Sequence, residues 1–375
     1  MKNTYLLGSI ILSIFCNILS STAQNIIPID TSNWEINAQS YVVENYEVKN
    51  SIYIQNGRIA LKNKNFKNGT IEFDVFLTER QSFPGVFFRQ VENTAEAFFL
   101  RPHLSGKADC NQGSPIINGI QAFQLYFGEA YSVAYEYNFS DWTHVKVVVN
   151  GNQAQAYFDN SNSPNLSWDL VNEPKEGGIS FGTSFAPMHF ADIKIDESKT
   201  EMVDFEVKNK RKRIDNIIQE WQLSGKFDEG QLDNPAKIES LVKAQKFEHS
   251  LEIVENIAVD ISHLHKIYDQ EIEGNTVFAK LDIDSESEQW KLFDFGYSDR
   301  VVVILNNKPI YQGNNKWRSR DYRYLGTIGF FDSVYHLPLN KGKNVLLLAV
   351  SEDFGGWLVT GKIDDMKGIT VNSLD

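Results

Sequence analysis

The sequence contains only two cysteines in 375 residues, Cys16 and Cys110. Cys16 lies in an N-terminal segment with the pattern of a cleaved export signal, which leaves Cys110 alone in the exported chain. One cysteine cannot form an internal disulfide, so this pattern excludes a fold held together by disulfide bonds. We predict that Cys110 is a small side chain in a loop or in the core, with a reactive thiol as the alternative.

Long apolar segments are also scarce. The first is Tyr5–Leu19, and neither it nor any later segment reaches the about 20 apolar residues of a membrane-spanning helix. Ser21 and Ala23 follow it at the spacing of small residues that signal peptidase requires. We therefore expect a signal peptide over residues 1–23, no transmembrane segment, and a secreted or periplasmic protein. A lipid anchor at Cys16 is the alternative.

Basic residues number 36 and acidic residues 49, which gives a formal net charge of -13. This balance disfavours nucleic acid as a partner, because phosphate binding needs a positive field. The sequence also lacks a nucleophile elbow, a phosphate-binding loop, a cysteine metal motif and a dinucleotide fingerprint, so we predict no cofactor. His263 and His265 lie near Asp260, but no third ligand stands at a useful spacing, and we predict no metal site.

Short segments of alternating polarity fill residues 24–200, and aromatic residues make up 13% of the chain. Both features are typical of a β-sandwich. Gln55–Gly57 and Asn150–Gln153 have the composition of hairpin turns. The expected strands are 51–54, 58–61, 70–77, 85–89, 97–101, 122–127, 142–149, 154–158, 178–182 and 188–195.

The pattern changes over residues 201–223, where five basic residues precede Ile214, Ile217, Ile218 and Trp221 at helical spacing. We predict a linker helix there, joining two domains near Glu201 to Arg213. Asn234 and Pro235 predict the start of a second, short helix. The remaining expected strands are 277–283, 301–305, 334–337, 345–350 and 357–363. The fold class is therefore all-β, with two β-sandwich (jelly-roll) domains, 24–200 and 224–375, joined by a short helical linker.

The first domain resembles the concanavalin A-like lectin and glucanase superfamily, in its laminin-G-like branch. The matching segments are Gly69–Val75, Gly85–Arg89, Trp142–Val149, Ala156–Asp159 and Gly177–Gly182. A further stretch from Phe98 to Tyr126 is similar to uncharacterised secreted proteins and to 3-keto-disaccharide hydrolase domains of the same fold. The resemblance implies a sandwich that acts on carbohydrate.

The second domain resembles the galactose-binding-like jelly rolls that accompany many glycosidases. The match lies in Asp299–Lys308 and Leu339–Leu347. Asn307 stands where that family usually has glycine, and asparagine also tolerates a positive φ, so the expected fold is retained.

Laminarinase-type glucanases of the first superfamily carry three carboxylates on one strand face, spaced i, i+2, i+5. Here Glu72 and Asp74 share a face, but Leu77 occupies the third position. A retaining glycosidase needs two carboxyls about 5 Å apart. Catalysis by Glu72 and Asp74 is therefore the weaker interpretation, and exposed charges are the alternative.

Two groups of residues are candidates for ligand binding. Arg89, Arg101 and His103 lie on strands expected to be neighbours, which would gather them with Glu96 on one surface, either as a sugar site or as an internal ion-pair network. The segment from Asn314 to Asp332 is dense in aromatic and charged residues, and Trp317 and Asp321 would share a face on a regular strand. The predicted ligand-binding residues are Arg89, Arg101, His103, Trp317, Arg320, Asp321, Tyr322 and Trp357.

These observations leave two main hypotheses for function. The first is a secreted, non-catalytic protein that binds a glycan or polysaccharide. The second is a glycoside hydrolase or related sugar-cleaving enzyme with its site in the first domain. Adhesion to protein is a third hypothesis, since laminin-G-like domains also serve that use, and fold alone does not decide among them.

We expect the exported chain to begin within a residue or two of Gln24, because small residues occupy Ser21 and Ala23. N-terminal sequencing of the exported protein tests this expectation. A mature chain that starts at lipid-modified Cys16 would contradict it.

Overall fold

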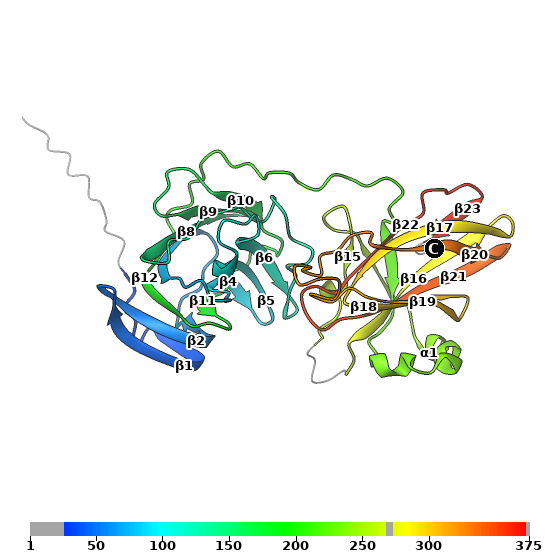
Figure 1. Ribbon diagram of the computed structural model, residues 1–375, viewed down its shortest axis with the longest axis horizontal. Coiled ribbons are helices and arrows are strands. Elements are labelled where there is room, and N and C mark those ends of the chain that lie inside the picture. The colour runs from blue at the N-terminus through cyan, green and yellow to red at the C-terminus, as the bar shows by residue number, and fades with distance from the viewer. Residues whose placement is uncertain (1–25, 268–272, 373–375) are drawn as a thin grey trace, which may run out of the picture.

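The computed structural model describes residues 26–267 and 273–372, and the expected signal peptide lies outside them. It shows two β regions side by side, each with its own sheets (Figure 1). The all-β fold class is confirmed. Within the described residues, no helix is long and apolar enough to cross a membrane.

The first domain is one antiparallel sheet of 12 strands that curls around a core. Its path is β10-β9-β8-β3-β12-β2-β11-β4-β5-β6-β7, with β1 paired to β2. The strands are β1 (Trp34–Tyr46), β2 (Lys49–Leu61), β3 (Gly69–Phe76), β4 (Gly85–Val91), β5 (Thr94–Leu100), β6 (Asn111–Ile117), β7 (Ile120–Gln121), β8 (Trp142–Asn150), β9 (Gln153–Phe158), β10 (Leu166–Asp169), β11 (Gly178–Thr183) and β12 (Met188–Asp196).

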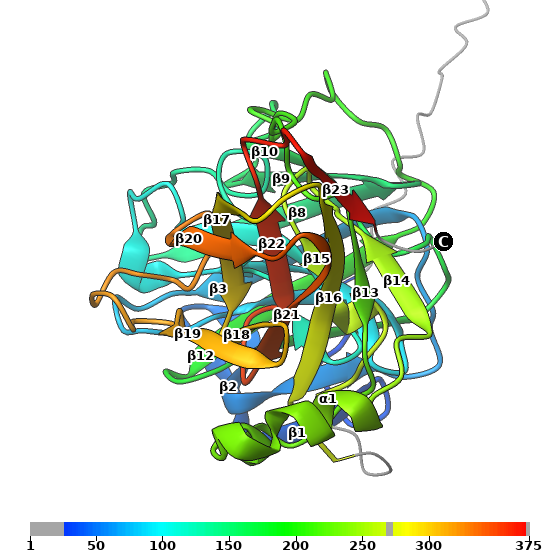
Figure 2. The same cartoon turned by 90° about the vertical axis from the view of Figure 1, so that its right-hand side faces the viewer.

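The second domain is a sandwich of a seven-stranded and a four-stranded sheet, ordered β14-β13-β16-β21-β18-β19, with β23 on β16, and β15-β22-β17-β20. Helix α1 (Ile238–Ala244) packs on the outer face of the larger sheet (Figure 2). The strands are β13 (Glu220–Leu223), β14 (His249–Glu252), β15 (Val259–Asp260), β16 (Thr276–Ser285), β17 (Gln289–Ser298), β18 (Arg300–Leu305), β19 (Lys308–Asn314), β20 (Asp332–Leu339), β21 (Gly342–Ser351), β22 (Leu358–Lys362) and β23 (Ile369–Asn372).

Alternation along the strands separates core from surface. In β3, Ile71, Phe73 and Val75 point into the core, while Glu72 and Asp74 point outward. The predicted short helix is confirmed, since the Asn234 side chain accepts a hydrogen bond from the Ala236 amide at the start of the helical turns. Asn307 has a φ of 66°, a positive value of the kind that asparagine tolerates at this position.

The linker helix predicted for residues 201–223 is wrong. Residues 201–219 are irregular and run along the outside of both domains, and β13 begins at Glu220 (Figure 1). The Ile218 amide donates a hydrogen bond to the Gly361 carbonyl, and Trp221 is fully buried in the core of the second domain. The apolar residues that had helical spacing thus pack into the second domain from an extended segment. The five basic residues before them would also repel each other on a helix.

Two further predictions in the first domain are wrong, the hairpin turn at Gln55–Gly57 and the strand at residues 122–127. Gln55–Gly57 is not a hairpin turn, because β2 continues through it with Asn56 at φ 44°. Gly57 is needed there because an added Cβ would lie 2.3 Å from the Asn37 carbonyl oxygen on β1. The chain reverses instead at Glu47 and Val48, and residues 122–127 form turns after β7. The asparagine–glycine pair therefore lies within a continuous pairing of β2 with β1 and does not reverse the chain.

Gln124 connects the two domains. It is fully buried, and its backbone bonds to Gly355 and Ile328 of the second domain. Its side-chain amide donates to the Leu325 carbonyl at 3.2 Å, and its side-chain oxygen accepts from the Ser298 hydroxyl. Gly355 leaves the space for it, because a Cβ there would lie 2.6 Å from Gln124 Cδ.

Replacing Gln124 with alanine should lower the free energy of unfolding by about 1–3 kcal/mol, because Ser298 and the Leu325 carbonyl would lose buried partners. Chemical denaturation measures this effect. Gln231→Ala, at an exposed position of the second domain, is the control. An unchanged midpoint for Gln124→Ala would show that the interface does not depend on this side chain.

Candidate functional site

The structure separates two residues that the sequence predicted to share a surface. Arg89 lies near the turn between β4 and β5, whereas Arg101 follows the opposite end of β5. The prediction that they gather on one surface is wrong, because the two strands are antiparallel and each arginine belongs to a different end of the pair.

Both arginines have internal partners. Arg89 is buried and donates to the carbonyls of Lys67 and Gly151 and to the Asn68 side chain. Arg101 is buried and donates to the Asp109 carbonyl at 2.9 Å and to the side-chain oxygen of Gln112. These contacts tie loops to the sheet, which is the structural alternative that the sequence left open.

His103 belongs to a half-buried aromatic cluster that the sequence did not reveal. Its ring lies 5.5 Å from Phe83, and Phe83 lies 5.7 Å from Phe185. Phe185 is 60% exposed and has a φ of 65°, a conformation that is uncommon for a bulky side chain and costs free energy. The Asn56 side-chain oxygen accepts a hydrogen bond from the Phe185 amide at 2.6 Å and so stabilises this backbone conformation.

The second domain brings Arg318 within reach of this cluster, and Trp317 precedes Arg318 in the chain. Both lie in the loop between β19 and β20, which reaches toward the first domain (Figure 1). Burial lowers the pKa of His103, and the positive charges of Arg101 and Arg318 lower it further against the opposing charge of Asp109. Arg318 therefore lies within electrostatic reach of His103. The Arg318 guanidinium lies 4.0 Å from the Trp317 ring centroid. We call Phe83, His103, Phe185, Trp317 and Arg318 the boundary surface.

The other predicted residues of the second domain have different roles. The segment is an irregular loop, so the expected strand alternation from Trp317 to Asp321 does not occur. Arg320 donates to Asn315 and pairs with Asp332 at 2.8 Å, which ties the loop to β20. Asp321 accepts the amide of Arg323. Tyr322 is 74% exposed and remains able to contact a ligand.

Trp357 cannot contact a ligand at the surface. It is fully buried, and its indole nitrogen donates to the Val350 carbonyl at 3.0 Å. Placing it in the ligand-binding set was wrong, because the second sandwich uses this ring to fill its core. Cys110 is likewise buried, and burial raises the pKa of its thiol, which disfavours the reactive form.

Glu72 and Asp74 belong to an ion-pair cluster on the outer face of β3. His144 on β8 lies 2.6 Å from Asp74 and 3.5 Å from Glu72, and Lys49 bridges Asp74 to Asp192. The hydrogen bond with His144 lowers the pKa of Glu72. Burial acts to raise the pKa of Asp74, but the bonds from His144 and Lys49 outweigh it, and the net shift is downward. Both carboxyls are therefore ionised at neutral pH.

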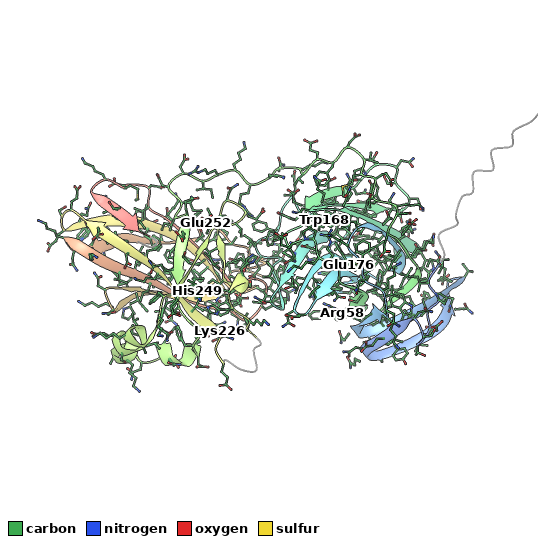
Figure 3. The ribbon with its side chains drawn as sticks, turned by 180° about the vertical axis from the view of Figure 1, so that it is seen from behind. Arg58, Trp168, Glu176, Lys226, His249 and Glu252 are labelled. Atoms are coloured by element: carbon green, nitrogen blue, oxygen red, sulfur yellow. The ribbon has the colours of Figure 1, made fainter. Side chains whose placement is uncertain are left out.

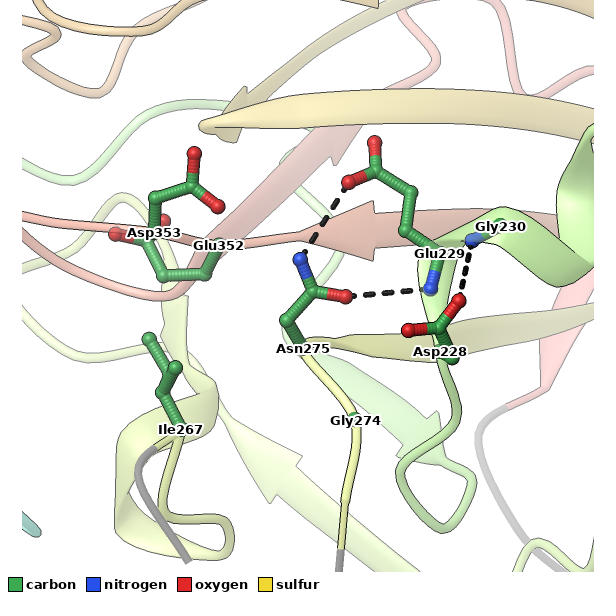
Figure 4. A pocket seen from close by; sticks show the side chains of 8 residues that line it. All are labelled: Asp228, Glu229, Gly230, Ile267, Gly274, Asn275, Glu352 and Asp353. Carbon is green, nitrogen blue, oxygen red and sulfur yellow. Dashed lines mark hydrogen bonds between the residues drawn. The ribbon is translucent and has the colours of Figure 1, made fainter.

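An open cavity of about 610 Å³ in the second domain is acidic (Figure 4). Arg300 pairs with Glu229 at 2.6 Å and with Asp353 at 2.8 Å, and the Asn275 side chain donates to the Glu229 carboxylate. Oε2 of the buried Glu352 has no hydrogen-bond partner among the described residues. Among the described residues, no three metal-ligating side chains cluster as a metal site requires. His265 bonds to the Ser224 carbonyl, and His263 ends a 3-10 turn, so the two do not form a ligand pair on a strand.

The pKa of His144 yields a stability prediction. The hydrogen bonds with Asp74 and Glu72 raise this pKa to about 9 from an ordinary value of 6.5. The folded state therefore binds the proton more tightly, and this stabilisation is full below pH 6.5 and is lost as the pH rises through about 9. We expect the free energy of unfolding of the wild type to fall by on the order of 1–3 kcal/mol between pH 7 and pH 9, and we expect His144→Gln to lack this decrease. Denaturation midpoints across that range test it, with exposed His249 changed to glutamine as the control. Parallel pH profiles for the wild type and His144→Gln would contradict it.

No protein family model matches the sequence, and no curated protein matches it. Solved structures are similar over roughly the first 45% of the chain. The carbohydrate binding module CBM66 from Bacillus subtilis is 14% identical, with a TM-score of 0.34, over 44% of this chain and 95% of that chain. The Bacillus licheniformis beta-glucanase is 9% identical, with a TM-score of 0.34, over 46% of this chain and 95% of that chain. A putative glycosyl hydrolase from Parabacteroides distasonis is 14% identical, with a TM-score of 0.31, over 45% of this chain and 89% of that chain.

Proposed function

We propose that this protein is an exported, non-catalytic carbohydrate-binding protein and that the boundary surface binds the glycan. The supporting observation is the set of accessible aromatic rings and cationic groups that the two domains place together. Phe185 is 60% exposed, Trp317 is 36% exposed, and the charge of Arg318 acts on His103 across the domain boundary.

The chemistry of these groups suits a sugar. Flat aromatic rings pack against the apolar faces of pyranoses, and guanidinium and imidazole groups donate hydrogen bonds to ring substituents. The Trp317 ring is held by the stacked Arg318, so less side-chain freedom is lost when a ligand packs on its other face. The unusual φ of Phe185 supports the same conclusion, since such a conformation persists where surrounding contacts enforce it.

Binding is favoured over hydrolysis because of the state of Glu72 and Asp74. A glycosidase needs one carboxyl that holds a proton for the leaving group. The pKa values of both residues are lowered, and His144 and Lys49 occupy their oxygens. This cluster therefore supports the structure of the outer face better than it supports acid catalysis.

The proposal extends to both domains. Export follows from the expected signal peptide, and a galactose-binding-like role for the second domain follows from its sequence resemblance and from the turn at Asn307. The loop between β19 and β20 would then supply the second domain's share of the sugar contacts.

We expect Trp317→Ala and Phe185→Ala each to weaken glycan binding on the order of tenfold or more, because each removes an accessible ring. A glycan array identifies the ligand, and titration of that glycan into the folded variants measures the loss. Trp290→Ala is the matched control. Trp290 is 69% exposed but lies at the far end of β17 from Ser298, the residue that contacts Gln124.

A reducing-sugar release assay on the same glycan separates binding from hydrolysis. No release by the wild type is expected. Release that Glu72→Gln or Asp74→Asn abolishes would overturn the non-catalytic assignment. Equal affinity of the Trp317, Phe185 and Trp290 variants would move the glycan site away from the boundary surface.

A further inference from the structure

Arg58 lies next to the boundary surface, on the outward face of β2 (Figure 3). The strand register places it in one row with Gly182 on β11, Gly85 on β4 and Phe99 on β5. Its sequence neighbour Ile59 points the other way, into the core. The Arg58 side chain therefore lies on the outer face of the sheet, and its two neighbours across the strands, Gly182 and Gly85, carry no side chain.

The two glycines allow Arg58 to lie flat across the sheet. A Cβ on Gly182 would lie 2.6 Å from the Arg58 Cγ, so any other residue would push the arginine away. With glycine there, the guanidinium reaches 3.5 Å from the ring centroid of Phe87 on β4. Phe87 thus orients the guanidinium and leaves its other face and its edges available.

The charge of Arg58 has no counter-ion among the described residues. Within residues 26–267 and 273–372, no carboxylate forms a salt bridge with Arg58, and its guanidinium has no hydrogen-bond acceptor. Surrounding protein lowers the pKa of Arg58 through desolvation, with no nearby carboxylate to offset the effect. The side chain nevertheless remains exposed. A partly desolvated cation with open donor edges gains free energy when an anion binds to it.

Ser180 adds a second unsatisfied group on the same face. It stands in the next row of the sheet, between Ala60 and Phe87, and its hydroxyl is buried with no partner among the described residues. The face is also continuous with the boundary surface, because Phe185 follows β11 directly and its amide bonds to Asn56, two residues before Arg58.

We propose that the protein prefers an acidic glycan and that Arg58 binds the anionic group of one sugar, either a uronate carboxylate or a sulfate ester. This inference rests on the proposed function, since it assigns a ligand class to the same surface. The neighbouring charges are mostly positive: Arg101 and Arg318 both act on His103, against the single carboxylate of Asp109. The planar guanidinium matches a carboxylate with two parallel hydrogen bonds.

The test uses the full mature chain and three defined probes: oligogalacturonate, its methyl ester, and a heparin-derived oligosaccharide. We expect at least one acidic probe to bind about tenfold or more tightly than the neutral ester at physiological salt. Tighter binding of oligogalacturonate assigns a carboxylate, and tighter binding of the heparin fragment assigns a sulfate. Arg58→Gln should remove the preference, and Arg58→Lys should retain part of it, since lysine keeps the charge but loses the paired donors.

Lys341→Gln is the control for net charge, because Lys341 is exposed in the turn before β21 and the change in charge is the same. Arg58 is exposed as well, so the melting temperature should stay constant in all three variants. If neutral and acidic probes bind equally, or if Arg58→Gln and Lys341→Gln weaken binding alike, the ligand class is refuted. Neutral binding that still requires Trp317 would then leave the proposed function intact, whereas no binding of any glycan would refute both.

Discussion

The buried amide of Gln124 is the interaction on which the arrangement of the two domains depends. Four hydrogen bonds from one residue of the first domain enter the second domain, at Ser298, Leu325, Ile328 and Gly355. Leu325 and Ile328 belong to the same β19–β20 loop that carries Trp317 and Arg318. The contact therefore ties the loop as well as the second domain to Gln124. The Asn118–Ser262 hydrogen bond and the Phe123–Phe354 ring contact cross the same boundary.

The two outer faces of the first domain differ in how their charges are satisfied. On β3 and β8, Glu72, Asp74, His144 and Lys49 neutralise one another, so their electrostatic energy supports the fold. On β2, β11 and β4, Arg58 lies on an aromatic ring without an opposing carboxylate. A satisfied cluster has little capacity to bind a ligand, whereas an unsatisfied cation retains it. This contrast explains why binding is assigned to the second of these faces.

Local strain marks the same region. Phe185 keeps a positive φ, and its ring stays exposed, because Asn56 accepts its amide and the bridge to Ser82 fixes the backbone on the other side. Asn56, with a φ of 44°, and Gly57 lie in β2 just before Arg58, and the pairing with β1 keeps its register across them. One short segment thus holds the conformation of Phe185 and leads directly into Arg58.

The sequence by itself determined the fold class, most of the strands and the short helix after Asn234. These features follow from alternation, turn composition and capping, which act between residues close in the chain. It also indicated that Asn307 could take a positive φ and that Cys110 would be a small side chain in a loop or in the core. The prediction of a linker helix was wrong because the spacing of Ile218 and Trp221 does not by itself distinguish a helix from an extended segment. Pairing with distant residues of the second domain decided for the extended segment.

Only the tertiary structure decided which polar and aromatic residues meet. Arg89 and Arg101 are close in sequence, yet antiparallel pairing places them at opposite ends of β4 and β5. Phe83 and Phe185 are far apart in sequence, yet the fold of the first domain brings them together beside His103, and domain packing adds Arg318. Trp317 and Trp357 were equally plausible ligand contacts from the sequence, but Trp357 is buried in the core and Trp317 is accessible. Local patterns specify the strands, whereas the sheet register and the burial of Gln124 select the side chains that form the surface, because both depend on contacts between distant residues.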